Sequence, residues 1–283
     1  MKFTNKNNLP DPVVRALTSY DKGEKVEGLR VTTLIDSPRI SQLRKEFAAE
    51  MFEDVSDMVW KVMGTAIHEV FEKAASNSYV SEERLSHEVN GTVISGAIDY
   101  QFEDDGEIDL KDYKSTSVYS VLMGDKPEWE KQINTYAYLI RHAKGLKVRS
   151  ASVVAVLRDW RKSDAERRGD YPQAPITEIK IKLWSDEEQD AYVAERVRLH
   201  RVAELEKDFG LPECSPEEQW KKKPIFAVHK GTNKRALKLF DTQAEAQAFA
   251  DQSDDRSVIE RPATLTRCEN NYCRVADFCD QWR

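Results

Sequence analysis

The amino-acid sequence predicts a protein of the α/β (α+β) class, with a mixed central sheet flanked by helices and a small module clamped by cysteines near the C-terminal end. Apolar residues in the N-terminal third recur every four positions, which is helix spacing. A run of short strands separated by turn residues follows, and helix-like and strand-like segments then alternate. With 283 residues and 40% hydrophobic content, the chain can bury a core.

The first half of the chain predicts a long helical region followed by strands. Every fourth residue from Leu43 to Phe71 is apolar, so helix is expected from residue 40 to about residue 75, after the short apolar run that ends at Pro38. Residues 84–116 show short apolar runs interrupted by Asn-Gly at residues 90–91 and by Asp-Asp-Gly at residues 104–106. These are hairpin turn signals, and they predict consecutive antiparallel strands.

The second half returns to helix spacing and ends in a distinct unit. Residues 128–144 place Trp129, Ile133, Tyr136 and Ile140 on one helix side. Strands are expected near residues 148–160 and 176–185, and a charged helix near residues 186–207. The composition then shifts, and residues 224–262 predict a ββαβ unit. We therefore expect a core of residues 1–208 with a helical N-terminal part, and a second module of residues 209–283.

Charge and apolar run length limit the classes of function. The net charge of -7 argues against nucleic-acid binding over the whole surface, so binding would need local basic clusters. Such clusters occur at residues 158–168, 220–223 and 229–238. No stretch approaches the roughly 18 to 20 apolar residues that span a membrane, and "MKFTNKNNLPDP" lacks the apolar segment of a signal peptide. We expect no membrane partner and a location in the cytoplasm of a bacterium or of a phage-infected host.

The segment "GEIDLKDYKST", residues 106–116, holds two overlapping D-x-K triplets. Because side chains alternate along a strand, the triplet of Asp112 and Lys114 shares the face that begins with apolar residues 108 and 110. That face is expected to be buried and to end with Asp112 and Lys114 at the rim of the sheet. Asp109 and Lys111 are expected on the opposite face, either solvated or paired with neighbours.

A second carboxylate is expected beside the first. Hairpin pairing across Gly106 would bring Asp99 next to Asp112. An isolated D-x-K is most often an ordinary salt bridge, but two converging carboxylates make a hard oxygen site suited to Mg²⁺ or Mn²⁺. Such a metal activates water and neutralises charge on a phosphodiester, while a nearby lysine positions the nucleophile or stabilises the transition state.

Four ordered segments resemble the PD-(D/E)XK nuclease superfamily, specifically its RecB-like branch, which includes AddB-type recombination nucleases and CRISPR adaptation nucleases. The segments are "GTAIHEVFE", "GAIDY", "DYKST" and "QINTYAYL", and the resemblance covers about residues 31 to 140. "VTTLIDSPR" also resembles the segment that opens these proteins. The resemblance implies a restriction-endonuclease-like core and metal-dependent hydrolysis of DNA.

The resemblance also implies a role for each matching residue. The implied ligands of Mg²⁺ or Mn²⁺ are His68, Asp99, Asp112 and the backbone carbonyl of Tyr113. The implied catalytic residues are Asp99, Asp112, Lys114, Gln132 and Tyr136, with Lys114 as the catalytic lysine. Gln132 and Tyr136 lie four residues apart and therefore on one helix face, where they would support the lysine and contact the substrate strand.

The four cysteines predict a second metal site. Cys268, Cys273 and Cys279 lie within twelve positions, and the fourth is Cys214. In a chain expected in the cytoplasm this favours metal over disulfides, and thiolates suit both Zn²⁺ and iron–sulfur clusters. Similar RecB-like nucleases often carry a [4Fe–4S] cluster on one distant cysteine and a C-terminal trio, which implies such a cluster here, with Zn²⁺ as the alternative.

The chain departs from that pattern at two places. The distant cysteine of these proteins commonly lies in the segment resembling "IDSPR", where this chain has Ser37, so Cys214 is the candidate fourth ligand. Four residues separate Cys268 from Cys273, where two are usual. Either metal would clamp the C-terminal tail against the "PECSP" turn.

These features predict a metal-dependent DNA nuclease, more an exonuclease on single-stranded DNA or DNA ends than an endonuclease, used in recombination, repair or phage DNA metabolism. "PECSPEEQW" and "RCENNYC" resemble bacteriophage-encoded members. The residues expected to guide DNA are Lys230, Lys234, Arg235 and Lys238. Because no Walker-type "GKT" or "GKS" occurs, unwinding would come from a partner such as a helicase or recombination protein. The alternatives are a non-catalytic nucleic-acid-binding or assembly subunit that retains the fold, and a metal–cysteine regulatory protein.

Overall fold

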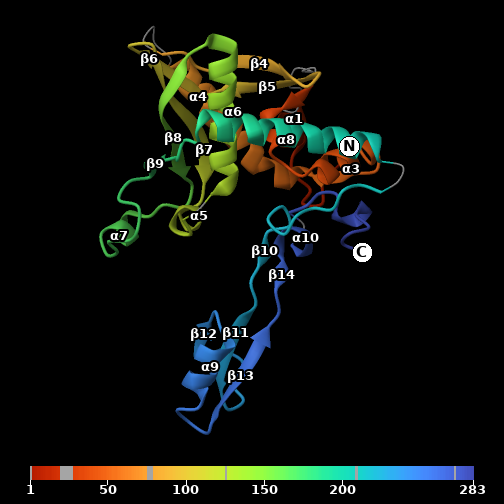
Figure 1. Ribbon diagram of the computed structural model, residues 1–283. Helices are drawn as coiled ribbons and strands as arrows, with labels where there is room; N and C mark the ends of the chain where they lie inside the picture. Colours follow the sequence, from red (N-terminus) through yellow and green to blue (C-terminus); the bar gives the residue numbers. More distant parts are fainter. Residues whose placement is uncertain (1, 20–27, 75–78, 125, 208–209, 271) are drawn as a thin grey trace. The chain divides into compact units, whose positions relative to one another are not determined.

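The computed structural model describes residues 2–19, 28–74, 79–124, 126–207, 210–270 and 272–283 (Figure 1). The chain divides into two compact units, one formed by residues 1–36 and 49–208 and the other by residues 37–48 and 209–283. The sequence places the boundary between residues 208 and 209, which lie outside the described residues.

Two mixed sheets form the centre of the first unit, as the sequence predicts. One sheet has the order β6 (Tyr100–Asp104), β7 (Glu107–Thr116), β8 (Lys147–Leu157) and β9 (Ile176–Lys180). In it, β7 and β8 are parallel and the two outer pairs are antiparallel. The other sheet has the order β2 (Leu29–Arg30), β5 (Thr92–Ile98) and β4 (Glu83–Val89). A separate parallel pair consists of β1 (Lys2–Thr4) and β3 (Phe52–Asp54).

Both hairpin turns occur where the sequence predicts them. Asn90 and Gly91 have φ angles of 50° and 77°, and Asp105 and Gly106 have φ angles of 52° and 77°. Two consecutive residues with positive φ make a turn whose twist matches that of the strands on either side, and Asn, Asp and Gly tolerate this backbone best. The turns therefore set the registers of β4 with β5 and of β6 with β7.

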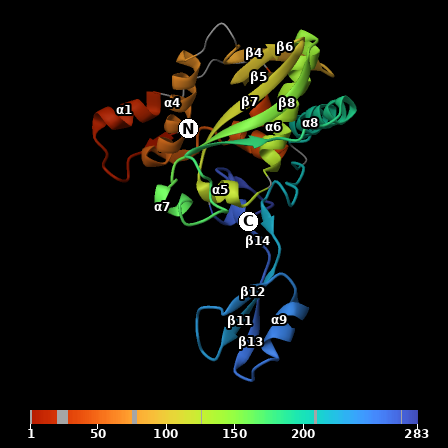
Figure 2. The same ribbon diagram turned by 90° about the vertical axis from the view of Figure 1, so that its left-hand side faces the viewer.

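Helices lie on both sides of the four-stranded sheet (Figure 2). On one side, α6 (Pro127–Lys144) and α8 (Asp186–Leu205) join α2 (Val31–Leu34) in the main core cluster. On the other side lies α4 (Val59–Lys73), whose Phe71 ring packs 4.7 Å from the ring of Tyr113. Pro127 starts α6 and Gly145 ends it in the left-handed region, while Ser185 and Glu188 form a capping box on α8.

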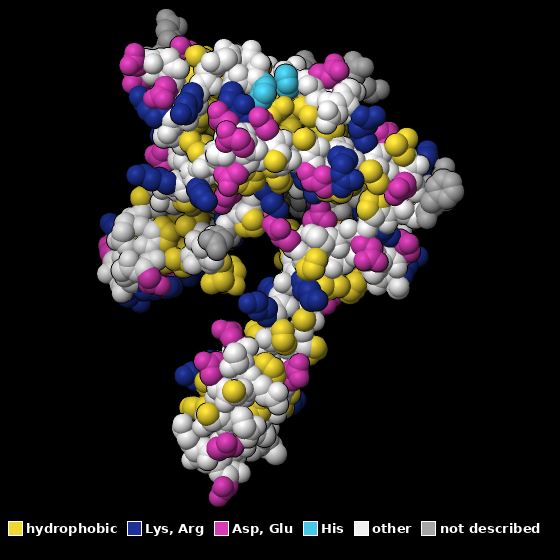
Figure 3. Space-filling view, viewed as in Figure 1, with side chains coloured by type: hydrophobic (Ala, Val, Ile, Leu, Met, Phe, Trp, Pro, Cys, Tyr) yellow, Lys and Arg dark blue, Asp and Glu magenta, His cyan; other side chains and the backbone are white. Residues whose placement is uncertain are grey.

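The remaining elements of this unit are short. They are α1 (Asp11–Ser19), the 3-10 helix η1 (Val55–Met58), α5 (Val118–Leu122) and α7 (Lys162–Ala165). Among the described residues, no helix is both long and apolar enough to cross a membrane. Acidic and basic side chains are interspersed over the face shown in Figure 3.

The prediction of one helical region from residue 40 to about residue 75 is wrong in its middle. A first helix, α3 (Pro38–Glu46), belongs to the second unit, and residues 52–58 form β3 and η1 before α4 begins. Asp54 explains the break, because its carboxylate accepts hydrogen bonds from the backbone N–H groups of Lys6 and Ser56. Such local bonds compete with helix. Residue 75 lies outside the described residues.

The second unit contains the predicted ββαβ order. An antiparallel sheet has the order β12 (Lys238–Phe240), β11 (Ile225–Lys230) and β13 (Arg256–Arg261), and α9 (Gln243–Ala250) packs on it. The strands β10 (Lys221–Lys222) and β14 (Thr264–Leu265) pair as an antiparallel ladder. The cysteine region contains α3, α10 (Thr266–Glu269) and the 3-10 helix η2 (Ala276–Phe278).

Candidate active site

The alternation along β7 selects the second D-x-K. Ile108, Leu110 and Asp112 are buried on one face, and Asp112 is only 2% exposed. On the opposite face, Asp109 pairs with Arg149 (Nη2 to Oδ2, 2.6 Å) and Lys111 pairs with Glu178 (Nζ to Oε1, 2.9 Å). The expectation that these two charges are paired with neighbours on the other face is confirmed.

Asp99 lies beside Asp112 in the middle of β7, where the pairing of β7 with β6 ends. Tyr100 pairs with Lys111 in the hairpin register, which places Asp99 across from Asp112. The backbone N–H of Tyr113 donates to Asp99 Oδ2 at 2.6 Å. Both carboxylates are buried. The predicted convergence of the two side chains is therefore present.

Lys114 and Gln132 hold Asp112 from two sides. The Lys114 ammonium lies 2.7 Å from Asp112 Oδ2, and Gln132 Nε2 donates to Asp112 Oδ1 at 3.0 Å. Gln132 Nε2 also lies 2.9 Å from Tyr136 Oη. The resemblance implied that Gln132 and Tyr136 support the lysine. In the structure Gln132 bonds Asp112, the ion-pair partner of Lys114, and Tyr136 contacts Gln132, because α6 covers the face of the strand that carries this carboxylate.

Close packing keeps Tyr136 in place. A Cβ atom on Gly96 of β5 would lie 2.6 Å from Cε1 of Tyr136 and 3.0 Å from Cγ2 of Val31. Only glycine leaves room for the ring at this point of the strand.

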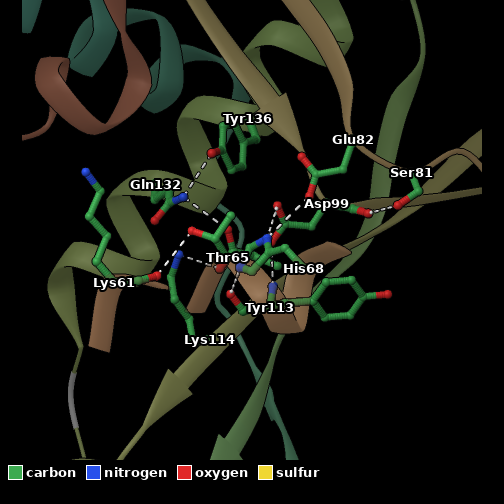
Figure 4. Close-up of polar contacts among 11 residues, drawn as sticks. Lys61, Thr65, His68, Ser81, Glu82, Asp99, Tyr113, Lys114, Gln132 and Tyr136 are labelled. Atoms are coloured by element: carbon green, nitrogen blue, oxygen red, sulfur yellow. Dashed lines mark hydrogen bonds and ion pairs between the residues drawn. The ribbon is translucent and has the colours of Figure 1, made fainter. Parts of the chain in front are cut away.

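His68 of α4 lies between three oxygen acceptors (Figure 4). Its Nδ1 is 3.3 Å from Asp99 Oδ1 and 3.3 Å from Glu82 Oε1, and its Nε2 donates to the carbonyl of Tyr113 at 3.0 Å. Since both ring nitrogens face acceptors, both carry protons. Hydrogen bonds that His68 donates to Asp99, the larger effect, and to Glu82 raise the pKa of His68 to about 10. In the metal-free protein His68 is an imidazolium at the centre of this group.

Sequence reasoning missed Glu82. The ligand atoms of His68, Glu82 and Asp99 lie within 4.8 Å of one another. Glu82 has a φ of 52°, a backbone conformation that costs a non-glycine residue roughly 1 kcal/mol or more and that tends to occur at functional sites. The residue stands in the charged stretch "SEER", where adjacent acids give no sign of which one turns inward.

The site fits a hard divalent cation. Burial raises the pKa of Asp112 above its ordinary range, with Lys114 opposing this shift and Asp99 adding to it. Asp112 Oδ2 accepts no hydrogen bond of good geometry, although the Lys114 ammonium is close. A buried carboxylate oxygen without such a donor, beside a second carboxylate and the Tyr113 carbonyl, is the donor set that Mg²⁺ and Mn²⁺ prefer.

The second unit brings the four cysteines to one cavity. All four line it together with Ile40 and Ala276. Cys214 Sγ lies 3.1 Å from the hydroxyl oxygen of Ser37. The structure therefore places Cys214 beside the position where the resemblance had led us to look for the distant cysteine.

Arg39 is a further residue of the cysteine region that sequence reasoning missed. Its side chain is 3% exposed. Its Nε donates to Cys279 Sγ at 3.3 Å, its Nη1 donates to the carbonyl of Leu211 at 2.7 Å, and its Nη2 pairs with Asp280. This guanidinium therefore joins α3 to the C-terminal segment that carries Cys279.

The thiols fit a soft metal group. Burial raises the pKa of Cys214 to about 11 and also raises the pKa values of Cys268 and Cys273. A bound metal would replace these protons. Among the described residues, no three of the cysteine sulfurs lie within 4.8 Å of one another.

The residues expected to guide DNA lie in the ββαβ part of the second unit. Lys230 pairs with Asp255 at 3.3 Å, and the Lys238 ammonium lies 5.0 Å from the centroid of the Phe240 ring. Lys234 and Arg235 are exposed.

Comparison with known proteins gives a fold likeness only. No protein-family model matches the chain, and no curated protein matches it. Among solved structures, the chain is similar to the protein SSO0001 at 18% identity and a TM-score of 0.46, over 67% of this chain and 83% of the other. It is also similar to the alkaline exonuclease LHK-Exo from Laribacter hongkongensis at 11% identity and a TM-score of 0.33, over 64% and 93%. Function has to be inferred from the side chains of the site.

Proposed function

We propose that this chain is a metal-dependent deoxyribonuclease of the PD-(D/E)XK type. The observation that carries the proposal is the grouping of Asp99, Asp112 and Lys114 where β6 stops pairing with β7, with a carboxylate oxygen of Asp112 left without a good hydrogen bond. A salt bridge alone would need neither the second buried carboxylate nor the histidine beside it.

Each residue has a distinct task in the proposed reaction. Mg²⁺ or Mn²⁺ would be held by Asp99, Asp112 and the Tyr113 carbonyl, with His68 and Glu82 beside them, and would supply an activated water and neutralise phosphate charge. Lys114 orients the attacking water or stabilises the charge that develops on the phosphate. Gln132 fixes the orientation of Asp112, and Tyr136 fixes Gln132.

We assign the chain to the RecB-like branch, as a bacteriophage-encoded exonuclease that acts on single-stranded DNA or DNA ends in recombination, repair or phage DNA metabolism. The order of its four motifs supports this assignment. A helicase or recombination protein would supply unwinding.

The basic residues 230, 234, 235 and 238 would guide DNA. Replacing Lys234 and Arg235 with Glu should weaken DNA binding and flatten its salt dependence.

For the cysteines we propose a [4Fe–4S] cluster with a structural role. The arrangement of one distant cysteine and a C-terminal trio around one cavity supports the cluster. Protein purified without oxygen should be brown, with absorbance near ~400 nm. If the purified protein is colourless and contains one zinc per chain, the cysteines bind zinc and not a cluster.

The nuclease proposal is tested with end-labelled single- and double-stranded DNA in Mg²⁺, Mn²⁺ or EDTA. Wild type should cut only with metal, and Asp112→Ala should lose cutting by about 100-fold or more, since it removes a metal ligand. Asp109→Ala is the matched control, one D-x-K earlier on the opposite face, and should keep activity. If wild type binds DNA but never cuts it, the chain is instead a non-catalytic subunit with this fold.

A further inference from the structure

A tryptophan and an arginine form an exposed pair in the first unit. Trp60, the second residue of α4, is 56% exposed, and the Arg158 guanidinium carbon lies 4.4 Å from the centroid of its ring. Within the part of the chain that the structure describes, Arg158 has no ion-pair partner. The guanidinium covers one face of the indole, so the large exposed fraction belongs mainly to the other face.

The pair lies on the same helix face as the candidate active site. Trp60, Gly64 and His68 follow one another at intervals of four residues on α4. The interval from Trp60 to His68 is roughly 12 Å at 1.5 Å per residue. A Cβ atom on Gly64 would meet no atom within 4 Å. The helix surface between the indole and the imidazole is therefore open to a ligand.

The arginine approaches from the carboxyl ends of the two parallel strands. Arg158 follows β8, and its N–H donates to the carbonyl of Thr116, the last residue of β7, at 2.9 Å. Asp159 accepts from the N–H of Val118 at 2.7 Å, which fixes this loop against the start of α5. Lys114 precedes Thr116 by two residues on the same face of β7. The pair and the acidic site thus share one edge of the sheet.

We propose that Trp60 and Arg158 form a stacking platform for single-stranded DNA. The open face of the indole takes one unpaired base, the guanidinium meets a neighbouring phosphate, and the strand continues over Gly64 to the carboxylates. Single strands offer base faces for such stacking, whereas a duplex hides them within its own stack. Substrate choice by this platform rests on the proposed nuclease function, but DNA binding by it can be measured without cutting.

The test measures binding of a fluorescent oligothymidine in EDTA. Trp60→Ala should weaken binding about 10-fold, because base stacking on an aromatic side chain contributes about 1–3 kcal/mol and 1.4 kcal/mol is tenfold. Trp60→Phe should keep most of the affinity. Phe52→Ala is the matched control: Phe52 is also exposed (65%) under a lysine ammonium, but it lies on β3 and should have no effect.

An abasic DNA oligomer, which keeps the phosphates but lacks the bases, separates the contribution of base stacking from that of charge. Wild type should bind an abasic oligomer about as weakly as Trp60→Ala binds oligothymidine, and Trp60→Ala should show no further loss with the abasic oligomer. Arg158→Gln should lower the slope of log affinity against log salt by about 0.7, the value for one phosphate contact on a single strand.

The platform is overturned if Trp60→Ala binds oligothymidine like wild type, or if it loses equal affinity for the abasic oligomer. Failure of the nuclease proposal is distinguishable from this. If DNA binding depends on Trp60 but the protein cuts no DNA in Mg²⁺ or Mn²⁺, the nuclease proposal is wrong and the stacking platform stands. If the Trp60→Ala protein cuts DNA and binds oligothymidine like wild type, the nuclease proposal stands and the stacking platform is wrong.

Discussion

Charged residues around Asp112 of β7 combine two buried carboxylates, those of Asp99 and Asp112, with three partly exposed charged groups. The imidazolium of His68 lies beside the carboxylates of Glu82 and Asp99, and the ammonium of Lys114 lies beside that of Asp112. Burial makes each ionised group costly, and the pairing only partly compensates. The metal-free site should therefore respond strongly to pH and to removal of single charges.

His68 should make the metal-free protein less stable in alkali. Its pKa in the folded state, about 10, lies above the unfolded value near 6.5, so its stabilisation is complete below pH ~6.5 and is lost as pH rises through 10. Thermal melting in EDTA should show this fall between pH 7 and 10 for wild type and a much smaller one for His68→Gln. Equal slopes for the two proteins would mean that His68 is neutral in the fold.

Asp112 and Asp109 should respond in opposite directions to loss of charge. Burial raises the pKa of Asp112, whereas hydrogen bonds from Arg149 lower the pKa of Asp109. At pH 7 in EDTA, Asp112→Asn should raise the melting temperature and Asp109→Asn should lower it slightly. The gain of Asp112→Asn should shrink on acidification, because the wild-type carboxyl then protonates. A loss of stability in both variants contradicts this account.

At the scale of elements, the site depends on where one strand ends and how closely one helix approaches it. The turn at Asp105-Gly106 sets the register that brings Asp99 to Asp112, and α6 carries Gln132 and Tyr136 onto the same carboxylate. Gly96 allows Tyr136 this approach. The space left by Gly96 thus affects the position of Tyr136, and through Gln132 the orientation of Asp112.

Two glycine-to-alanine changes should have opposite effects on stability. Gly96→Ala should destabilise by about 1–3 kcal/mol, because the new methyl group collides with Tyr136. Gly64→Ala should stabilise by about 0.5–1 kcal/mol, since Gly64 lies inside α4 and its added Cβ meets open space. Urea unfolding of both variants checks the pair. A harmless Gly96→Ala would show that the strand can shift away from α6.

At the scale of the whole molecule, the chain builds two units from interleaved segments. Residues 37–48 leave the first unit and form part of the second, where α3 supplies Ser37 and Arg39 to the cysteine region. A metal group there would join this inserted helix to the C-terminal residues. Removal of this metal group should destabilise the second unit before the first.

The closeness of Ser37 and Cys214 should allow a ligand to be exchanged between segments 177 positions apart. Cys214→Ser should lower the metal or cluster content, and adding Ser37→Cys should restore most of it, because the two side chains point to one place. Iron, sulfide and zinc analysis measures this. Ser41→Cys, one turn further along α3, is the control and should not restore it. Restoration by both cysteines, or by neither, contradicts the assigned position.

The sequence by itself determined the features that depend on neighbouring residues. Alternation along residues 107–116 selected Asp112 over Asp109, and Asn-Gly and Asp-Gly located both hairpin turns, because strand faces and turn conformations are properties of consecutive residues. The spacing of apolar residues likewise predicted α6.

Only the tertiary structure decided the contacts between distant segments. Helix spacing continued through residues 47–58, yet residues 52–54 form β3, where Asp54 accepts hydrogen bonds from Thr4 and Lys6 near the start of the chain. The contacts that single out Glu82, Arg39 and the pair of Trp60 with Arg158 all join residues more than ten positions apart. No local pattern encodes such partners, because their free energy arises only when folding brings the segments together.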